Sequence, residues 1–442
     1  MVGAPLGRQI FLRSPTGFPL RGEGPATRGR VAWGFSIGHA SAVGGVTVRF
    51  SAWVLGTDPI APPARILFRG ANGLVHVAQA GLRRMDAMRA LSITAGPADP
   101  VTHCGFQGEF VTAEAALDVR VEGEGFSATL GRVEFPAPGV VAGQDGWLFL
   151  AGDSNDSIIQ HSQDHAPTAA WIRQWKKYFA AMRTIPDGKA ILLVPPAKEA
   201  VMPERHHLPR STETPVSHLL SAHSDQLLFP RDELRADRDF TYDRTDTHWT
   251  DYAGRIACEA LLARLGVKVP PVPAIYSVGQ RPGDLGGKLF PAETDRRLMA
   301  AWPGARLVFD NYALHHGNIR IYTNPDAPMQ KTVTIFGGSS SEQMIPYLGA
   351  LHARIVSIYG AGSWDPEIIA HECPEIVILQ TNERFLVTPP APHFDCRAVA
   401  RRKITRGHVT RRGDQSEALR QFAALGEGWY VERYSALAGK RA

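Results

Sequence analysis

The sequence lacks several features that would place it in common classes of protein. No apolar run reaches the roughly 18 residues that a membrane-spanning helix needs, so we expect no transmembrane segment. The only apolar patch near the N-terminus is short and is interrupted by Arg8, Gln9 and Arg13, so it does not make a secretory signal peptide. From these absences we expect a cytoplasmic protein.

The chain is also poor in the residue patterns that build metal centres. Its four cysteines include no C-x-x-C pair, and their spacing predicts no zinc site. Four histidines are clustered without a cysteine or carboxylate at ligand spacing: His206, His207, His218 and His223. We therefore expect neither a metal ion nor another cofactor.

Net positive charge is absent from most of the chain and concentrated at its C-terminal end. The net charge is +5, and residues 397–442 contain eleven Lys/Arg against four Asp/Glu, which leaves the rest of the chain at about −2. A basic segment of this kind can bind an anionic ligand, but it is equally typical of a solvated extension. Because no nucleic-acid-binding motif accompanies it, we expect no nucleic-acid partner.

The patterns that are present predict two domains of different kinds. With 44% hydrophobic and 21% charged residues the chain can bury a core. After an N-terminal tail, residues 1–28, the region 29–138 contains short alternating β-rich runs broken by Gly and Pro, as at 46–55, 64–69, 116–121 and 126–135. This pattern predicts a β-sandwich-like domain, which could be carbohydrate-related.

Residues 139–400 predict a second domain, of the α/β class. Strands are expected at 190–196, 332–336, 353–359 and 375–381, and helices lie between the later ones. Before the first strand, an amphipathic helix is expected with five residues on its apolar face: Trp171, Trp175, Tyr178, Phe179 and Met182. Strands that alternate with helices indicate a doubly wound parallel sheet, whose ligand sites lie at the carboxyl ends of the strands. Residues 401–442 are expected to form a basic C-terminal extension.

A serine-rich turn, G-G-S-S-S (337–341), follows one of the predicted strands and opens a helix. Such a turn lifts a side chain above the sheet, and the helix start offers free backbone N–H groups. The pattern suits a nucleophilic serine, although a phosphate-binding loop or a simple helix cap has the same appearance.

A second candidate is D-T-H-W-T (246–250), ahead of a helix that Thr250 is expected to cap. A serine needs an imidazole to accept its proton, and a carboxylate to fix the tautomer of that imidazole. Asp246 and His248 could supply both groups. A capping aspartate and a surface histidine are the alternative.

Six segments together resemble the SGNH hydrolase-like domain of the alginate O-acetyltransferase (AlgJ/AlgX-like) group. In chain order they are G-Q-D-G-W-L-F-L (143–150), V-P-P-A-K-E-A-V-M-P-E (194–204), D-T-H-W-T, G-D-L-G-G-K-L (283–289), I-F-G-G-S-S-S (335–341) and E-I-V-I-L-Q-T-N-E-R-F-L (375–386). The resemblance implies Ser339 as nucleophile, His248 as base and Asp246 as orienting acid, in the permuted order Asp-His before Ser. It also implies a periplasmic or exported protein, as the alternative to a cytoplasmic one.

One departure from the family and several weaker candidates accompany this triad. Gly338 stands where many members have Asp, which puts the turn and the oxyanion hole in doubt and makes Ser340 a competing nucleophile. The other candidates could contact substrate or brace the site, or could equally be structural: Lys198, Arg384, Tyr347 and Trp249.

The resemblance predicts a serine-dependent O-acetyltransferase, or an acetylesterase, that acts on a polysaccharide or other glycan. Its partners would be a glycan acceptor and an acyl donor, with an acyl-enzyme on Ser339. The alternative is a non-catalytic glycan-binding or scaffold protein with a degenerate site.

Overall fold

The computed structural model describes residues 10–13, 31–42, 45–57, 60–114, 116–123, 126–134, 139–185, 190–289, 293–411 and 415–435. The chain divides into two compact units. Unit 1 comprises Met1–Val141 with Gly287–Glu293, and unit 2 comprises Ala142–Gly286 with Thr294–Ala442. Within the described residues, no helix combines the length and apolarity that crossing a bilayer requires.

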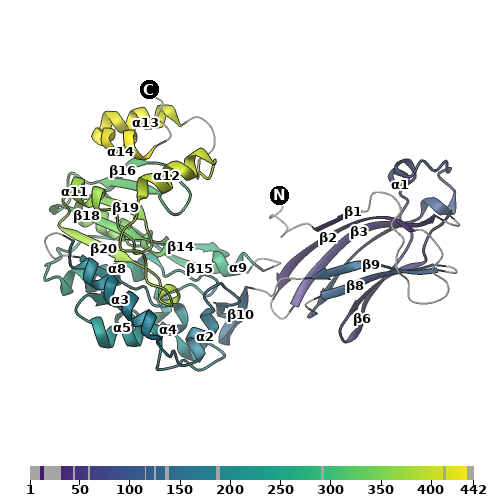
Figure 1. The fold of residues 1–442 in the computed structure, drawn as a ribbon, viewed down its shortest axis with the longest axis horizontal. Coiled ribbons are helices and arrows are strands. Elements are labelled where there is room, and N and C mark those ends of the chain that lie inside the picture. The colour runs from purple at the N-terminus through teal and green to yellow at the C-terminus, as the bar shows by residue number, and fades with distance from the viewer. Residues whose placement is uncertain are drawn as a thin grey trace. The chain divides into compact units, whose positions relative to one another are not determined.

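Unit 1 contains two antiparallel sheets (Figure 1). The first has five strands: β1 (Ile10–Arg13), β2 (Val31–Ala42), β3 (Gly45–Thr57), β4 (Ile60–Ala61) and β7 (Gly105–Thr112). The second has four: β5 (Arg65–Gly70), β6 (Gly73–Gln79), β8 (Ala116–Gly123) and β9 (Phe126–Glu134). Among the described residues of this unit, short helical segments are α1 (Met85–Ala90) and η1 (Pro100–Thr102).

The buried side chains of both sheets join in one apolar cluster, which includes Val48 and Phe50 of β3, Phe68 of β5 and Val119 of β8. This packing follows from the alternation in the sequence, because every second residue of a strand points to the same face. Residues 1–28 are not only the tail that the sequence predicts, because Ile10–Arg13 form β1, which pairs with β2. The remainder of 1–28 lies outside the described residues, and so do the residues directly before the domain boundary predicted at 138.

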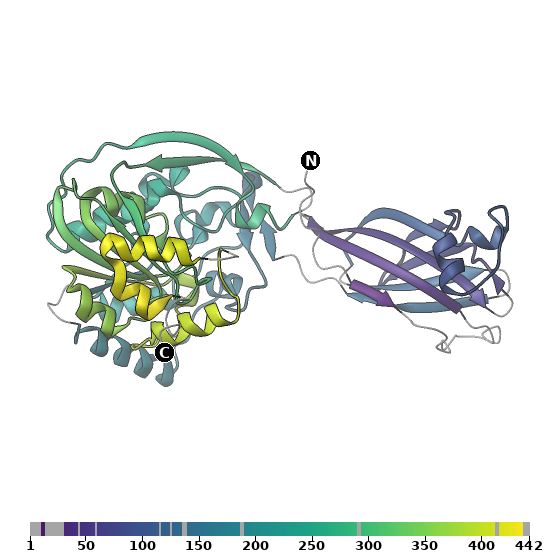
Figure 2. The same ribbon diagram turned by 90° about the horizontal axis from the view of Figure 1, so that it is seen from above.

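Unit 2 is built on a mixed seven-stranded sheet in the order β13-β12-β20-β18-β19-β17-β16 (Figures 1 and 2). Its strands are β12 (Ala190–Leu193), β13 (Leu227–Leu228), β16 (Arg306–Asp310), β17 (Ile319–Thr323), β18 (Met329–Gly337), β19 (His352–Tyr359) and β20 (Ile376–Gln380). The first five strands in that order are parallel, as predicted. β17 pairs in reverse with β19 and so runs against the first five strands, and β16 pairs in reverse with β17 and so runs in their direction. The sequence did not indicate this reversal.

Two smaller two-stranded sheets complete the strands: β10 (Val140–Ala142) with β11 (Leu148–Leu150), and β14 (Ile275–Arg281) with β15 (Asp295–Ala301). The α-helices are α2 (Ser157–Ser162), α3 (Ala169–Met182), α4 (Lys198–Val201), α5 (Pro215–His223), α6 (Arg231–Ala236), α7 (Arg238–Thr241), α8 (Asp251–Arg264), α9 (Gly283–Gly286), α10 (Ile345–Leu351), α11 (Pro366–Glu372), α12 (Cys396–Thr405), α13 (Ser416–Phe422) and α14 (Gly428–Tyr434). The short 3₁₀ segments are η2 (Gln144–Gly146), η4 (Pro203–Arg205), η5 (Ser339–Ser341) and η6 (Glu383–Phe385), and η7 (Ala423–Glu427) is a π-helical turn.

Helix α3 contributes much of the core of unit 2. The five apolar residues at helical spacing are all buried, as predicted: Trp171, Trp175, Tyr178, Phe179 and Met182. They join the sheet residues in the main apolar cluster of the unit. The helix begins at Thr168, whose side chain accepts a hydrogen bond from the backbone N–H of Trp171 at 3.1 Å.

The C-terminal region does not stand apart from this domain. The boundary predicted at residue 401 falls inside α12, and Leu419, Tyr430 and Tyr434 are buried in the main apolar cluster. The charge of this segment gives no sign of the packing, because an amphipathic helix carries basic residues on one face and apolar residues on the other. An anionic ligand for the exposed basic residues of this region stays a prediction.

Candidate active site

Ser339 lies directly after the central strand β18. The strand is buried from Val333 to Gly337, and η5 begins at Ser339. A Cβ atom at Gly337 would lie 2.7 Å from the Cβ of Ser341, so the turn is tight enough to require glycine there. Ser339 is therefore raised at the carboxyl end of a parallel strand, the position at which α/β sheets hold their ligands.

Gly338 itself does not require glycine. Its φ of −112° is open to any residue, and a Cβ atom would lie 3.7 Å from Gln380 Oε1, an ordinary contact. Its backbone N–H donates to Gln380 Oε1 at 2.6 Å. The departure from the family pattern at this position therefore leaves the turn held by a side chain of the neighbouring strand β20.

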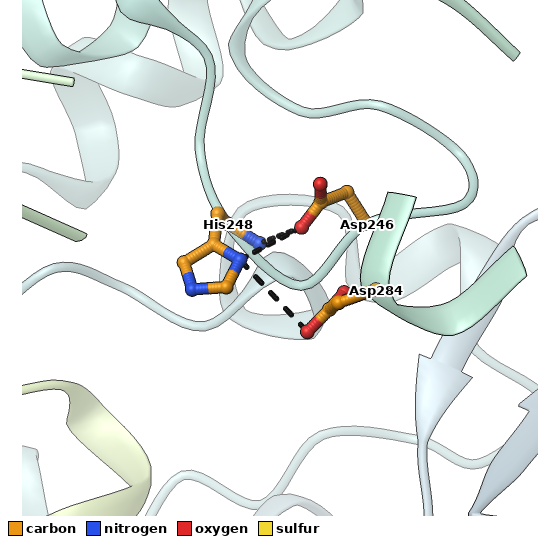
Figure 3. Close-up of side chains that lie close together, drawn as sticks. All are labelled: Asp246, His248 and Asp284. Carbon is orange, nitrogen blue, oxygen red and sulfur yellow. Dashed lines mark hydrogen bonds and ion pairs between the residues drawn. The ribbon is translucent and has the colours of Figure 1, made fainter. Parts of the chain in front are cut away.

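His248 and Asp246 meet Ser339 in a continuous hydrogen-bonded chain. The distance from His248 Nε2 to Ser339 Oγ is 2.8 Å, and that from His248 Nδ1 to Asp246 Oδ1 is also 2.8 Å. Asp246 Oδ1 further accepts the backbone N–H of His248 at 2.9 Å, as Figure 3 shows for the Asp246–His248 pair. His248 and Ser339, 91 positions apart in the sequence, are thus joined by one side-chain contact.

The loop that carries these two residues is ordered by the start of α8. Thr250 caps the helix, as predicted, and its side chain accepts from the N–H of Ala253 at 3.2 Å. Gly254 in the first turns of α8 allows a close approach, because a Cβ atom there would lie 2.3 Å from the carbonyl oxygen of Gln343. This contact brings the helix that follows His248 against the segment that follows Ser339.

Asp246 is an ionised carboxylate. Burial opposes its ionisation, but hydrogen bonds from the side chain and backbone of His248 hold its pKa well below its usual range. An ionised carboxylate can only accept, so Nδ1 of His248 carries the proton that the 2.8 Å contact shares. Nε2 of a neutral imidazole is then the acceptor for the Ser339 hydroxyl.

Lys198 binds the backbone of the Asp246 loop. Its ammonium donates to the carbonyl oxygens of Asp243 at 3.1 Å, Arg244 at 3.0 Å and Asp246 at 2.7 Å. It also lies 5.5 Å from the ring centroid of Trp147. Burial lowers the pKa of Lys198 to about 8. The structure thus favours the structural alternative, because all three donors are already used on backbone oxygens.

Asp284 is a second carboxylate near the imidazole, as Figure 3 also shows. Its oxygens accept from Thr247, from the backbone N at 2.6 Å and from Oγ1 at 2.5 Å, and one of them lies 3.8 Å from His248 Nδ1. Donor atoms of Asp246, His248 and Asp284 all lie within 4.8 Å of one another, a spacing open to a metal ion. Since each carboxylate already accepts from protein groups, hydrogen bonding accounts for the cluster.

The other predicted residues lie outside the hydrogen-bonded chain. Trp249 is 1% exposed and donates through Nε1 to the carbonyl of Ser340 at 2.7 Å, so it belongs to the core and fixes the serine turn. Ser340 is buried, whereas Ser339 is the serine in contact with His248. Arg384 stacks on Phe385, with its guanidinium 4.9 Å from the ring centroid, and borders a small cavity beside Glu383.

Tyr347 lies in a separate groove. Its hydroxyl donates to Glu259 Oε1 at 3.0 Å, and Glu259 also binds Arg255. These three residues and Tyr276 line a groove of about 640 Å³ between α8 and residues 267–276. Tyr347, a candidate for contacting substrate or bracing the site, thus lines a groove whose lining includes neither Ser339 nor His248.

Arg297 and Asp243 are the site residues that sequence reasoning missed. Arg297 of β15 is 4% exposed, and its Nη1 lies 3.3 Å from Asp246 Oδ2 and 3.6 Å from Asp243 Oδ2. The sequence gives a weak signal for Asp243, which lies three residues before Asp246. A second acid so close to the D-x-H segment needs a cation nearby to balance its charge. Nothing local singles out Arg297, since the segment around it contains three basic or acidic neighbours of the same appearance.

The fold and geometry place unit 2 among α/β domains that hold a serine, a histidine and an aspartate in one hydrogen-bonded chain at the strand ends. Residues 140–275 match the family model of the SGNH hydrolase-like domain, acetyltransferase AlgX. This match confirms the resemblance that the six motifs indicate. No curated protein matches the chain.

Solved structures of low similarity are also found. The O-acetyltransferase domain of Pseudomonas putida AlgJ is 20% identical, with a TM-score of 0.40, 61% of this chain covered and 100% of that one. A DHHW family protein from Eubacterium siraeum is 12% identical, with a TM-score of 0.39 and coverages of 62% and 92%. Bacillus cereus PatB1 with a sulfonyl adduct is 10% identical, with a TM-score of 0.40 and coverages of 56% and 95%. The assignment therefore relies on the family model.

Proposed function

We propose that the protein is a serine-dependent O-acetyltransferase that acts on a glycan through an acyl-enzyme on Ser339. The observation that carries the proposal is the hydrogen-bonded chain from Ser339 Oγ through His248 to Asp246, with both contacts at 2.8 Å. The family match of residues 140–275 supports acetyl transfer as the reaction class. The glycan acceptor follows from the family resemblance.

In the first half-reaction Ser339 Oγ attacks the acetyl carbonyl of the donor, and its proton passes to His248 Nε2. The ionised Asp246 stabilises the imidazolium that forms. As the tetrahedral intermediate collapses, the donor oxygen leaves with the proton from His248, and the acetyl group stays on Ser339. In the second half a glycan hydroxyl attacks this ester, with His248 again as base and then as acid.

The developing oxyanion needs donors close to Ser339. The first N–H groups of a helix have no acceptor within it, and in η5 the first internal bond is donated by Ser341, to the Gly338 carbonyl at 3.1 Å. The backbone N–H groups of Ser339 and Ser340 are therefore the proposed oxyanion donors. Trp249 donates to the carbonyl of Ser340, in the peptide group next to the one that carries the Ser340 N–H, and so restrains the turn. Donors held in place stabilise charge at little reorganisation cost.

The same triad serves an acetylesterase if water replaces the glycan hydroxyl. To separate the two, the protein is incubated with an acetyl-ester donor and an oligosaccharide, and acetylated sugar is separated from free acetate. Transfer predicts acetylated sugar in excess over acetate. The reverse ratio would make the protein an esterase with the same nucleophile.

Ser339→Ala tests the nucleophile, and Ser340→Ala is its matched control in the same turn. We expect Ser339→Ala to lose activity by at least about 10³-fold and to resist labelling by a serine-reactive phosphonate. Ser340→Ala should keep both properties within a few fold. Full activity of Ser339→Ala would overturn the mechanism.

The alternative function is a non-catalytic glycan-binding or scaffold protein, with the β-rich unit 1 as the binding module. It would be supported by glycan binding together with a failure of phosphonate to label Ser339. The closed Ser339–His248–Asp246 chain argues against a degenerate site, since a site under no catalytic demand has no need of two 2.8 Å contacts in series.

A further inference from the structure

Strand β15 is joined to the loop that carries Asp246 at successive positions. Asp295, at the start of the strand, accepts from Arg244 through the backbone N at 2.9 Å and through Nη2 at 2.8 Å. Two residues later, Arg297 reaches Asp246. β15 thus follows the Asp246 loop from before the aspartate onwards.

A further contact joins the far end of β15 to the start of α8. The backbone N–H of Ala300 donates to Asp251 Oδ2 at 3.2 Å. Asp251 is the first residue of α8, three residues after His248. The hairpin therefore holds the loop both before and after the Asp246–His248 pair.

Arg297 occupies the centre of this junction. Its guanidinium is buried between two carboxylates, those of Asp246 and Asp243, and its side chain is only 5% exposed. Asp246 uses Oδ1 for His248 and leaves Oδ2 to Arg297. A carboxylate bound at both oxygens cannot rotate without losing one of the two partners.

We propose that Arg297 is a positioning residue that fixes the Asp246 carboxylate and, by its charge, sets how readily His248 takes up a proton. The catalytic consequence rests on the proposed function, but the electrostatic one does not. Asp246 is ionised and Arg297 balances its charge behind the imidazole, whereas Asp243 ionises only as the pH approaches 7, because burial raises its pKa. Removing Arg297 therefore leaves the charge of Asp246 unbalanced.

Other charged groups face the same place and must stay unchanged in a test. Asp284 lies 3.8 Å from His248 Nδ1, and the Lys198 ammonium lies against the carbonyl of Asp246. Asp295 faces Asp243 and is paired with Arg244. All remain in place in the variants below, so a difference between variants reports on Arg297 and Asp243.

The test is an NMR titration of the His248 imidazole in the full chain, assigned by the signal that His248→Gln removes. In Arg297→Met we expect the pH midpoint to move upward by about one unit or more, because loss of a nearby positive charge favours the imidazolium. In Asp243→Asn we expect at most a small downward shift, because Asp243 ionises only as the pH approaches 7. Arg297→Lys should lie close to the wild type in midpoint, because it keeps the charge.

Arg296→Met is the matched control, because Arg296 is the exposed neighbour of Arg297 on the same strand. It removes the same charge from the same hairpin, and its midpoint should equal that of the wild type. A purely structural role for Arg297 would leave the midpoint of Arg297→Met equal to that of Arg296→Met. If Arg297→Met does not fold, the double variant Arg297→Met/Asp243→Asn decides, because it leaves no second carboxylate without its partner: its midpoint should lie above that of Asp243→Asn, and equal midpoints overturn the proposal.

Kinetics then separate this inference from the proposed function. If acetyl transfer runs through Ser339, Arg297→Met should lower kcat by about 10- to 100-fold with little change in KM, and the acidic limb of its pH profile should move upward. Arg297→Lys should return the acidic limb of the pH profile to its wild-type position but restore only part of kcat. One ammonium cannot span two carboxylates as a guanidinium does. If Ser339→Ala keeps full activity, the proposed function fails while the titration still judges Arg297.

Discussion

Gly254→Ala is the perturbation that tests most directly how the two halves of the site are held together. Gly254 is buried in α8, and a Cβ atom there would lie 2.3 Å from the carbonyl oxygen and 2.7 Å from the carbonyl carbon of Gln343. Because both atoms belong to the backbone, no side-chain rotation relieves the clash. A normal contact needs the two segments to separate by about 1 Å.

That separation falls on the reacting atoms. α8 begins three residues after His248, and Gln343 follows Ser339 by four residues, so moving one segment from the other lengthens the 2.8 Å contact from His248 Nε2 to Ser339 Oγ. A misplacement of about 1 Å can cost on the order of 10²-fold in rate. Overpacking costs about 1–3 kcal/mol of stability, partly offset by the roughly 1 kcal/mol that alanine gains over glycine in a helix.

The assay is acetyl-ester turnover with thermal unfolding measured beside it. We expect kcat to fall by about 10²-fold while the midpoint of unfolding falls by only a few degrees. Gly428→Ala is the control, because nothing lies within 4 Å of a Cβ atom at that position. Gly254→Ala with wild-type kcat would refute the reasoning that this contact sets the distance between histidine and serine.

Three further predictions concern the surroundings of the triad. Lys198→Met leaves three buried carbonyls without their donor, so urea denaturation should show a loss of about 2–4 kcal/mol, and an unchanged midpoint would contradict the supporting role of Lys198. Burial raises the pKa of Asp243 to about 7, so the unfolding free energy of the wild type should fall as pH rises from about 4 to 7. Asp243→Asn should remove a dependence on the order of 3–4 kcal/mol, measured by urea titrations across that range, and equal slopes for both proteins would contradict the buried acid. Gly337→Ala should lose activity because of the 2.7 Å approach to Ser341, whereas Gly338→Ala should keep it, and equal turnover of the two would contradict the geometry of the turn.

The sequence predicted those parts of the fold that depend on near neighbours. The apolar face of α3, the cap at Thr250 and the buried strand before Ser339 all follow from spacing within a single element, and all are present. The β-rich character of residues 29–138 follows in the same way from alternation. The match of residues 140–275 to the family model bears out the resemblance based on the motifs.

Tertiary structure decided the roles of the charged and aromatic residues around the triad. Lys198 and Trp249 were open between a ligand and a structural role, and their partners, backbone carbonyls in both cases, lie 45 residues or more away in the chain. The basic C-terminal region likewise belongs to the core, because Tyr430 and Tyr434 pack in the main apolar cluster. Side-chain chemistry limits what a residue can bind, but not which of many acceptors lies within reach.

The sequence by itself determined that an acid, an imidazole and a serine occur in two segments of the right kind, one before a helix and one after a strand. Only the tertiary structure decided that His248 faces Ser339 and not Ser340, and that Asp246 has Arg297 behind it. The reason is physical: helix starts and strand ends are set by local hydrogen bonding, whereas a contact across 91 residues is set by the packing of α8 and β15 around the loop between them.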